Sequence, residues 1–230
     1  MSMSMSESKD MNAARTEVLG RIRSALADVP VGETPGAVPV ARDYLRNDDS
    51  APEARIERFL ERVAEYKAAV HRVKAADLPA AIASACAARG VKRLVVPPDL
   101  PAEWLPKGVV VLRDTGQALT NDQLDTSDGV LTACALAIAQ TGTIVLDSGP
   151  GQGRRALTLL PDYHLCVVLE DQIVGVVPEA VARLVESPGA VRRPLTWISG
   201  PSATSDIELS RVEGVHGPRT LEVLVVAGDA

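Results

Sequence analysis

The chain has 230 residues, of which 46% are apolar, and its formal net charge is −6. This length and composition suit a globular protein with one α/β domain and an appendage, or with two small domains. The acidic charge argues against nucleic acid as a partner, and no apolar run approaches the roughly 20 residues that a membrane span needs.

The first part of the chain is expected to form a short disordered segment and a helical appendage. Residues 1–10 alternate Met and Ser without an apolar stripe, so we expect them to be disordered rather than to act as a signal or transit peptide. Residues 12–27 and 51–73 repeat apolar side chains at helical spacing, and residues 29–51 have the Pro-, Gly- and Asp-rich composition of a linker. Residues 11–75 are therefore predicted to be a helical N-terminal appendage.

From residue 77 onward, helical segments alternate with short apolar strands. The predicted helices span residues 77–89, 133–140 and 178–186. The predicted strands span residues 93–96, 109–112, 143–146, 164–169, 173–177, 195–199 and 221–226. This alternation predicts an α/β fold over residues 76–230, with a mainly parallel sheet flanked by helices. Ligands of such sheets bind beyond the carboxyl ends of the strands, so we expect a site there.

The three cysteines are odd in number and far apart in the sequence. Cys86, Cys134 and Cys166 form neither a disulfide framework nor a CxxC metal pair, and we expect them to be small buried hydrophobic residues. An iron–sulfur cluster normally takes four thiolates, so this chain alone cannot hold one.

A glycine-rich stretch at residues 147–153 follows a predicted strand and resembles a dinucleotide-binding loop. Such a loop needs a helix directly after its glycines, but only residues 154–160 separate it from Pro161. We therefore expect no Rossmann-type NAD site. Two interpretations stay open: a turn that joins two strands, or an anion-binding loop in which Arg154 and Arg155 supply the charge.

Hydroxyls and carboxylates gather in the segment after the predicted strand 195–199. The segment contains Ser202, Thr204, Asp206 and Glu208. At the carboxyl end of a strand such groups commonly bind phosphates or carboxylates. The equally weighted alternative is that they cap a turn and start a short helix.

A histidine in a glycine-flanked loop precedes the last predicted strand. His216 lies between Gly214 and Gly217, and histidine side chains titrate near neutral pH. A single loop histidine is more often structural, but its neighbours in the two loops include acids and Arg219, which favours a site. We interpret His71 and His164, which lie on a predicted helix and strand, as structural.

Three sequence runs together resemble a known family. Residues 139–146, 200–208 and 214–218 are similar to the lactate-utilisation protein C (LutC) family, which carries the LUD domain, and the resemblance covers about residues 12–228. It implies a NagB/RpiA/CoA-transferase-like fold and a cytoplasmic subunit that supports oxidation of L-lactate to pyruvate. It also implies iron–sulfur clusters on partner subunits, with no cofactor bound by this chain.

The polar loops and the resemblance together suggest a set of site residues. We expect Asp206, Glu208 and His216 to be catalytic. The residues expected to bind substrate are Thr141, Gly142, Thr143, Ser202, Thr204, Gly217 and Arg219.

Three hypotheses for the function follow. The first is a non-redox subunit of a lactate-oxidising complex, with a pocket for a small anion or a partner's group. The second is a stand-alone enzyme similar to a CoA-transferase or sugar-phosphate isomerase, acting on a small anionic substrate with Glu208 as nucleophile or base. The third is a scaffold whose motifs only shape turns. Because redox chemistry needs a cofactor, and the sequence has no nicotinamide or flavin signature, autonomous oxidation is disfavoured.

Overall fold

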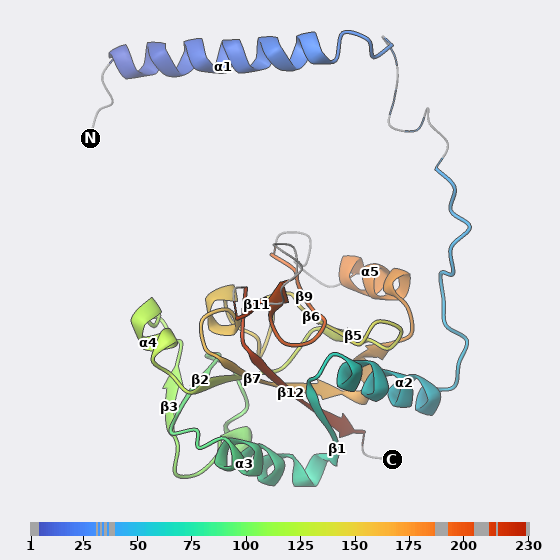
Figure 1. The fold of residues 1–230 in the computed structure, drawn as a ribbon, viewed down its shortest axis with the longest axis vertical. Helices are drawn as coiled ribbons and strands as arrows, with labels where there is room; N and C mark the ends of the chain where they lie inside the picture. Colours follow the sequence, from blue (N-terminus) through green and yellow to red (C-terminus); the bar gives the residue numbers. More distant parts are fainter. Residues whose placement is uncertain are drawn as a thin grey trace. The chain divides into compact units, whose positions relative to one another are not determined.

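The computed structural model describes residues 5–30, 32, 34, 36, 40–186, 193–204, 212–214 and 216–228. The chain divides into two compact units, Met1–Tyr44 and Leu45–Ala230. The first unit contains helix α1 (Met5–Ala25), which therefore includes part of the segment expected to be disordered, while residues 1–4 lie outside the described residues. The second unit contains the sheets and all further helices (Figure 1).

A six-stranded, all-parallel sheet forms the centre of the second unit. Its strands are, in order across the sheet, β1 (Ala69–Lys74), β12 (Thr220–Ala227), β7 (Tyr163–Leu169), β4 (Gly129–Thr132), β2 (Arg93–Val96) and β3 (Val110–Arg113). The central strands β7 and β12 are buried along almost their whole length, as is typical of parallel strands covered on both faces. The predicted α/β class with a mainly parallel sheet is confirmed.

A smaller sheet of four strands packs beside the first. It contains β8 (Ile173–Val174), β5 (Leu136–Ile138), β6 (Thr143–Leu146) and β9 (Thr196–Ile198), and a separate ribbon pairs β10 (Ala203–Thr204) with β11 (Val212–Glu213). The helix expected at 133–140 is wrong, because β5 forms an antiparallel hairpin with β6. Leu136 and Ile138 face one core while Ala137 faces another, which is the two-residue period of a strand.

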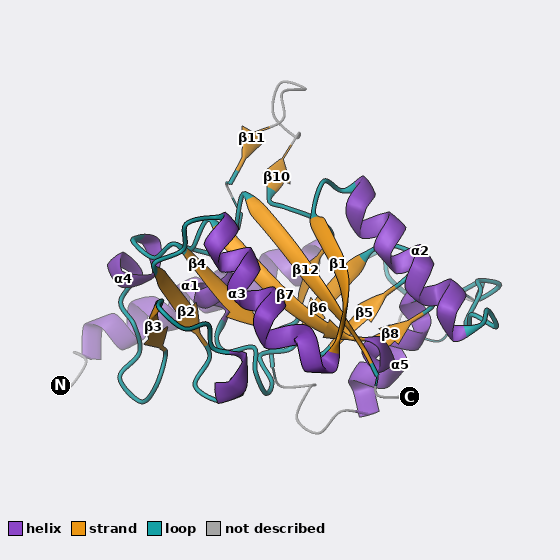
Figure 2. Ribbon diagram, turned by 90° about the horizontal axis from the view of Figure 1, so that it is seen from below, coloured by secondary structure: helices purple, strands orange, loops and turns teal. Residues whose placement is uncertain are grey.

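The helices and the two sheets form layers. The helices of this unit are α2 (Pro52–Glu65), α3 (Leu78–Ala88), α4 (Asn121–Asp125) and α5 (Val177–Glu186). Helix α3 covers one face of the six-stranded sheet, where Ile82 packs with Leu165 and Leu224 (Figure 2). The opposite face packs against the four-stranded sheet, whose outer face is covered by Ala180 and Leu184 of α5.

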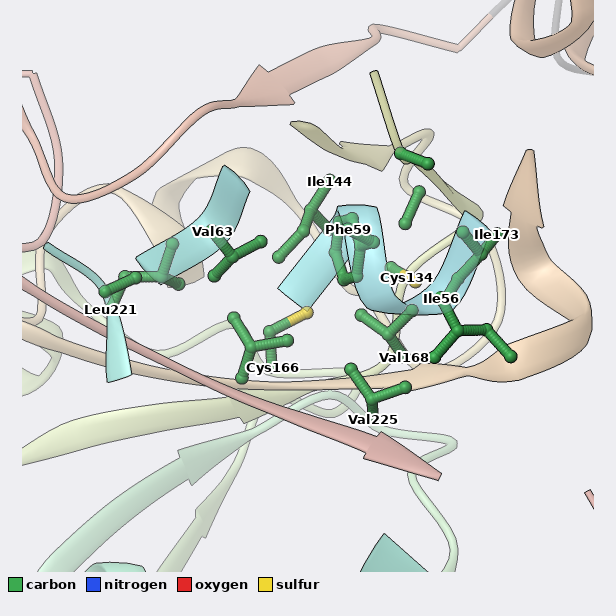
Figure 3. Packing of buried hydrophobic residues seen from close by; sticks show 14 of the residues in the cluster. Ile56, Phe59, Val63, Cys134, Ile144, Cys166, Val168, Ile173, Leu221 and Val225 are labelled. Carbon is green, nitrogen blue, oxygen red and sulfur yellow. The ribbon is translucent and has the colours of Figure 1, made fainter. Parts of the chain in front are cut away.

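Helix α2 is anchored in the core between the two sheets. Its Ile56, Phe59 and Val63 are buried in one cluster with Cys166 and Val168 of β7 (Figure 3). This packing places α2 in the same compact unit as the sheets, and the division between the two units falls after Tyr44.

The expected helix over residues 51–73 is also too long. Helix α2 ends at Glu65, Lys67 adopts a left-handed φ of 64°, and β1 then joins the six-stranded sheet beside β12. The pattern in β1 alternates, since Val70 packs in the core with α2 and Val73 packs in the core with α3. Within the described parts of the chain, no helix combines the length and apolar character needed to cross a membrane.

A buried polar group joins the amino end of β7 to β12. Glu222 of β12 accepts hydrogen bonds from the Tyr163 hydroxyl at 3.0 Å and from Arg89 Nε at 3.1 Å. Burial, followed by the nearby Glu222 carboxylate, raises the pKa of Tyr163. The first of these bonds satisfies the hydroxyl of Tyr163, which precedes His164 on β7.

Substitution of the central α2 side chain tests this packing. Phe59 is fully buried, so Phe59→Ala should lower the free energy of unfolding by about 3–5 kcal/mol, because it leaves a cavity between α2 and the sheet. Urea denaturation measures the change. The matched control is the exposed Glu57 on the same helix, where Glu57→Ala should change the value by no more than about 0.5 kcal/mol. Equal effects of the two variants would contradict the anchoring of α2.

Candidate functional site

A pocket of about 190 Å³ lies at the amino ends of β7 and β12. Its lining includes His164 and Leu221, which are the second residues of these two strands. The remaining lining residues are Arg155, Thr158, residues 196–203 and residues 216–218. The pocket therefore lies at the amino ends of two parallel strands and beside the residues that follow the carboxyl end of β9 (Thr196–Ile198). The loop that carries His216 enters β12, and so it meets the sheet at the amino edge.

His164 is held at the pocket by a buried hydrogen bond. Only 1% of the residue is exposed, and its Nε2 lies 2.8 Å from Thr132 Oγ1 on the neighbouring strand β4. The same hydroxyl lies 3.9 Å from Cys166 Sγ. A threonine hydroxyl has a single proton, so when Thr132 donates to Cys166, His164 must donate its own Nε2 proton to Thr132. From the sequence, His164 is interpreted as structural, and the sequence does not predict that it lines a pocket.

Two thiols lie behind this histidine. A hydrogen bond from Cys134, with further bonds from His164 and Thr132, lowers the pKa of Cys166. The same bond between the thiols, together with burial, raises the pKa of Cys134. The single Cys134 proton can alternatively be donated to Gln172 Oε1, at 3.4 Å.

The third cysteine lies on the opposite face of the six-stranded sheet. Cys86 packs in the core under α3, and burial, followed by the charge of Glu222, raises its pKa to about 11. Cys134 and Cys166 belong to the core under α2. The prediction that all three cysteines are buried is confirmed.

Two adjacent arginines after the glycine-rich loop have different surroundings. Arg154 forms an ion pair with Asp114, with Nε 2.9 Å from Oδ2. Arg155 lies in the pocket lining and donates to two neutral acceptors, Thr158 Oγ1 at 3.1 Å and the His216 carbonyl at 3.2 Å. Burial lowers the pKa of Arg155.

The glycine-rich loop itself is a turn closed around a buried carboxylate. Asp147 accepts hydrogen bonds from the Gly149 amide at 3.0 Å and from Gln152 Nε2 at 2.8 Å, and it pairs with Arg193 at 2.6 Å. A single 3-10 turn, Arg155–Thr158, follows the glycines. The loop therefore agrees with the interpretation of a turn that joins two strands. Of the two arginines, Arg155 lines the pocket and Arg154 does not.

The structure brings several of the predicted site residues together. Ser202, His216 and Gly217 all line the pocket, and Ser202 Oγ accepts a hydrogen bond from the His216 amide at 3.1 Å. Arg219 lies elsewhere, in an exposed ion pair with Asp162 at 2.9 Å.

The two expected catalytic acids cannot be placed. Asp206 and Glu208 lie outside the described residues, and for Thr204 only the backbone, in β10, is described. The catalytic roles expected for Asp206, Glu208 and His216 stay predictions.

The Thr141–Thr143 segment lies behind the pocket wall. It forms the β5–β6 hairpin turn, where Gly142 has a φ of 59° and an added Cβ would come within 2.8 Å of Arg62 Cβ. Thr143 Oγ1 lies 2.7 Å from both Thr141 Oγ1 and Ser199 Oγ. Because Ser199 lines the pocket, this chain of hydroxyls ends at its wall. A substrate-binding role for the segment stays a prediction.

Comparison with known proteins identifies related sequences. A family model of the LUD domain matches residues 56–226. A Deinococcus radiodurans protein named "Lactate utilization protein C" is 50% identical over 218 residues, which cover 93% of this chain and 95% of that protein. A Shouchella clausii protein with the same name is 34% identical over 116 residues, covering 50% of this chain and 49% of that one.

A solved structure is similar as well. The crystal structure of a DUF162 family protein from Deinococcus radiodurans has 47% sequence identity and a TM-score of 0.67. The similarity covers 77% of this chain and 99% of that chain.

The buried thiols give a direct chemical test of the site's interior. All three cysteines are buried, so Ellman's reagent should leave them unmodified in the folded protein and should react with three thiols after unfolding in guanidinium. This holds even for Cys166 with its lowered pKa, because a thiolate must also be accessible to react. Rapid modification of any thiol in the folded protein would show that reagents reach the interior behind His164.

Proposed function

The chain belongs to the LUD domain family, and we propose that it is a cytoplasmic subunit of a bacterial L-lactate utilisation system. In this proposal, it supports the oxidation of L-lactate to pyruvate together with iron–sulfur partner subunits. The observation that carries the proposal is the similarity to the Deinococcus radiodurans relative, which extends over nearly the whole of both chains. A shared fold alone would not support a shared function, but identity at this level and length does.

The arrangement of the cysteines favours partner subunits as the site of electron transfer. Oxidation of lactate removes two electrons, which side chains alone do not accept. Cys86 is separated from Cys134 and Cys166 by the six-stranded sheet, so the three thiols cannot converge on one cluster. A cluster normally takes four thiolates, and the chain has three cysteines.

The pocket suits a small polar ligand better than a large cofactor. Its volume of about 190 Å³ is below the roughly 300–1,000 Å³ of pockets for drug-sized ligands. Its lining supplies a cation from Arg155, an imidazole from His164 and several hydroxyls. These are groups that bind small anions.

The isolated chain should not oxidise lactate by itself. We expect no NADH when the purified protein is mixed with L-lactate and NAD, measured by absorbance against a lactate dehydrogenase as positive control. Robust NADH formation by the isolated chain would contradict the subunit proposal.

A genetic experiment tests the function itself. In a bacterium that uses L-lactate as sole carbon source, deletion of the gene for this chain should abolish growth on L-lactate and leave growth on pyruvate unchanged. Re-expression of the wild-type chain should restore growth. A tagged chain purified from these cells should retain partner proteins that contain iron and acid-labile sulfide. Normal growth of the deletion strain on L-lactate, in the absence of a second pathway, would contradict the proposal.

A further inference from the structure

We propose that the pocket at the amino ends of β7 and β12 binds a small carboxylate. The Arg155 guanidinium holds the carboxylate group, and the His164 imidazole contacts an oxygen on the adjacent carbon. The inference rests on the proposed function, because lactate utilisation provides acids of this class, namely 2-hydroxy and 2-oxo acids. The proposal places the ligand on this chain. It also assigns binding to Arg155 and His164, which are not among the site residues expected from the sequence.

The first argument is the charge of Arg155. Its guanidinium is half-buried in the pocket lining and donates to two neutral oxygens, on Thr158 and on the backbone of His216. Among the described residues, no carboxylate pairs with it. A partly desolvated cation is stabilised by an anion, and the planar guanidinium fork matches a carboxylate in a bidentate geometry.

Three arginines in other parts of the structure have a different arrangement. Arg154 pairs with Asp114, Arg193 pairs with Asp147, and Arg219 pairs with Asp162. Each of these guanidinium groups already has a carboxylate partner. Arg155 differs from these three arginines because no carboxylate among the described residues pairs with it.

The second argument is the fixed position of His164. The ring is held by the 2.8 Å contact between Nε2 and Thr132 Oγ1, and it lines the pocket although it is almost fully buried. Because Nε2 faces Thr132, the other ring nitrogen, Nδ1, is the one left for a ligand. Nδ1 accepts a hydrogen bond from a hydroxyl when Nε2 carries the ring proton, and it donates to an oxo group when Nδ1 carries the proton itself. Because Thr132 restrains the ring, little side-chain freedom is lost when a ligand binds.

The third argument is the mixed character and size of the pocket. Ile198 and Leu221 line it together with the polar groups, which gives a short alkyl group an apolar surface. At about 190 Å³, the pocket has room for an acid of a few carbon atoms. The apolar surface of Ile198 and Leu221 favours a small carboxylate with an alkyl group over inorganic phosphate.

Isothermal titration calorimetry of the full chain tests the proposal. The titrants are sodium L-lactate, sodium pyruvate and inorganic phosphate at constant ionic strength. We expect saturable binding of at least one of the two acids, and weaker or no binding of phosphate. Arg155→Met keeps an unbranched side chain similar to the aliphatic part of arginine and removes the charge, so it should weaken binding of the acid about tenfold or more.

Arg219→Gln is the matched control, because it removes the same charge from an exposed ion pair near the pocket but outside its lining. It should leave the affinity within about twofold of the wild type. Equal affinities of Arg155→Met and the wild type would overturn the proposal, as would the absence of binding for both acids at millimolar concentrations. Tighter binding of phosphate than of either acid would overturn the assignment to a carboxylate.

Histidine NMR of the wild-type chain gives a test that does not depend on the folding of a variant. The sequence has three histidines, and His164→Gln identifies the His164 ring signal. Pyruvate or L-lactate should shift the His164 signal and leave that of His71, which does not line this pocket, unchanged. An unchanged His164 signal at saturating acid would overturn the proposal. Ligand binding without restored growth on L-lactate would instead contradict the proposed function and leave the site assignment intact.

Discussion

Coverage of both faces of the six-stranded sheet is the constraint on which the rest of the structure depends. Polar side chains such as Tyr163, His164 and Glu222 are therefore largely removed from water on β7 and β12, and an unpaired buried polar group costs about 1–3 kcal/mol. Each such group therefore has a partner: Tyr163 bonds to Glu222, and His164 bonds to Thr132. His164 differs from Tyr163 because it also reaches a pocket, at the point where the strand begins.

The pocket is assembled from segments that are distant in the sequence. One wall follows β9, another precedes β12, and Arg155 comes from the turn after the glycine-rich loop. Backbone and hydroxyl bonds join the first two, since the Ser202 amide donates to the Pro218 carbonyl at 2.9 Å and the His216 amide donates to Ser202 Oγ. The third segment is joined to the loop before β12 by the hydrogen bond from Arg155 to the His216 carbonyl. The position of each polar group thus depends on contacts with the other two segments.

Much of the fold could be predicted from local patterns. The predicted strands 93–96 and 143–146 have the bounds that the structure shows, because short apolar runs between turns are typical of buried strands. The sequence of residues 133–140 predicts a helix, because its alanine-rich composition favours one. In the structure, residues 136–138 instead form strand β5, which pairs with β6 and β8. These pairings are contacts with other segments of the chain, so the local sequence does not reveal them.

The site was harder to predict than the fold. The loops with Ser202 and His216 were found from their crowded polar residues, and they do meet. Arg154 and Arg155 look equivalent in sequence, and only the contact of Arg154 with the distant Asp114 distinguishes them. A signal for His164 was present, since a histidine near the start of an otherwise apolar strand needs a partner. Its partner Thr132 lies on a different strand, so the signal could not show whether the residue was structural or also part of a pocket.

The central claim is that lactate utilisation depends on this pocket. It is tested most directly by growth on L-lactate of the deletion strain that expresses either Arg155→Met or Arg219→Gln. Both variants should accumulate as folded proteins; Arg219→Gln should restore growth and Arg155→Met should not, whereas full growth with Arg155→Met would contradict the account.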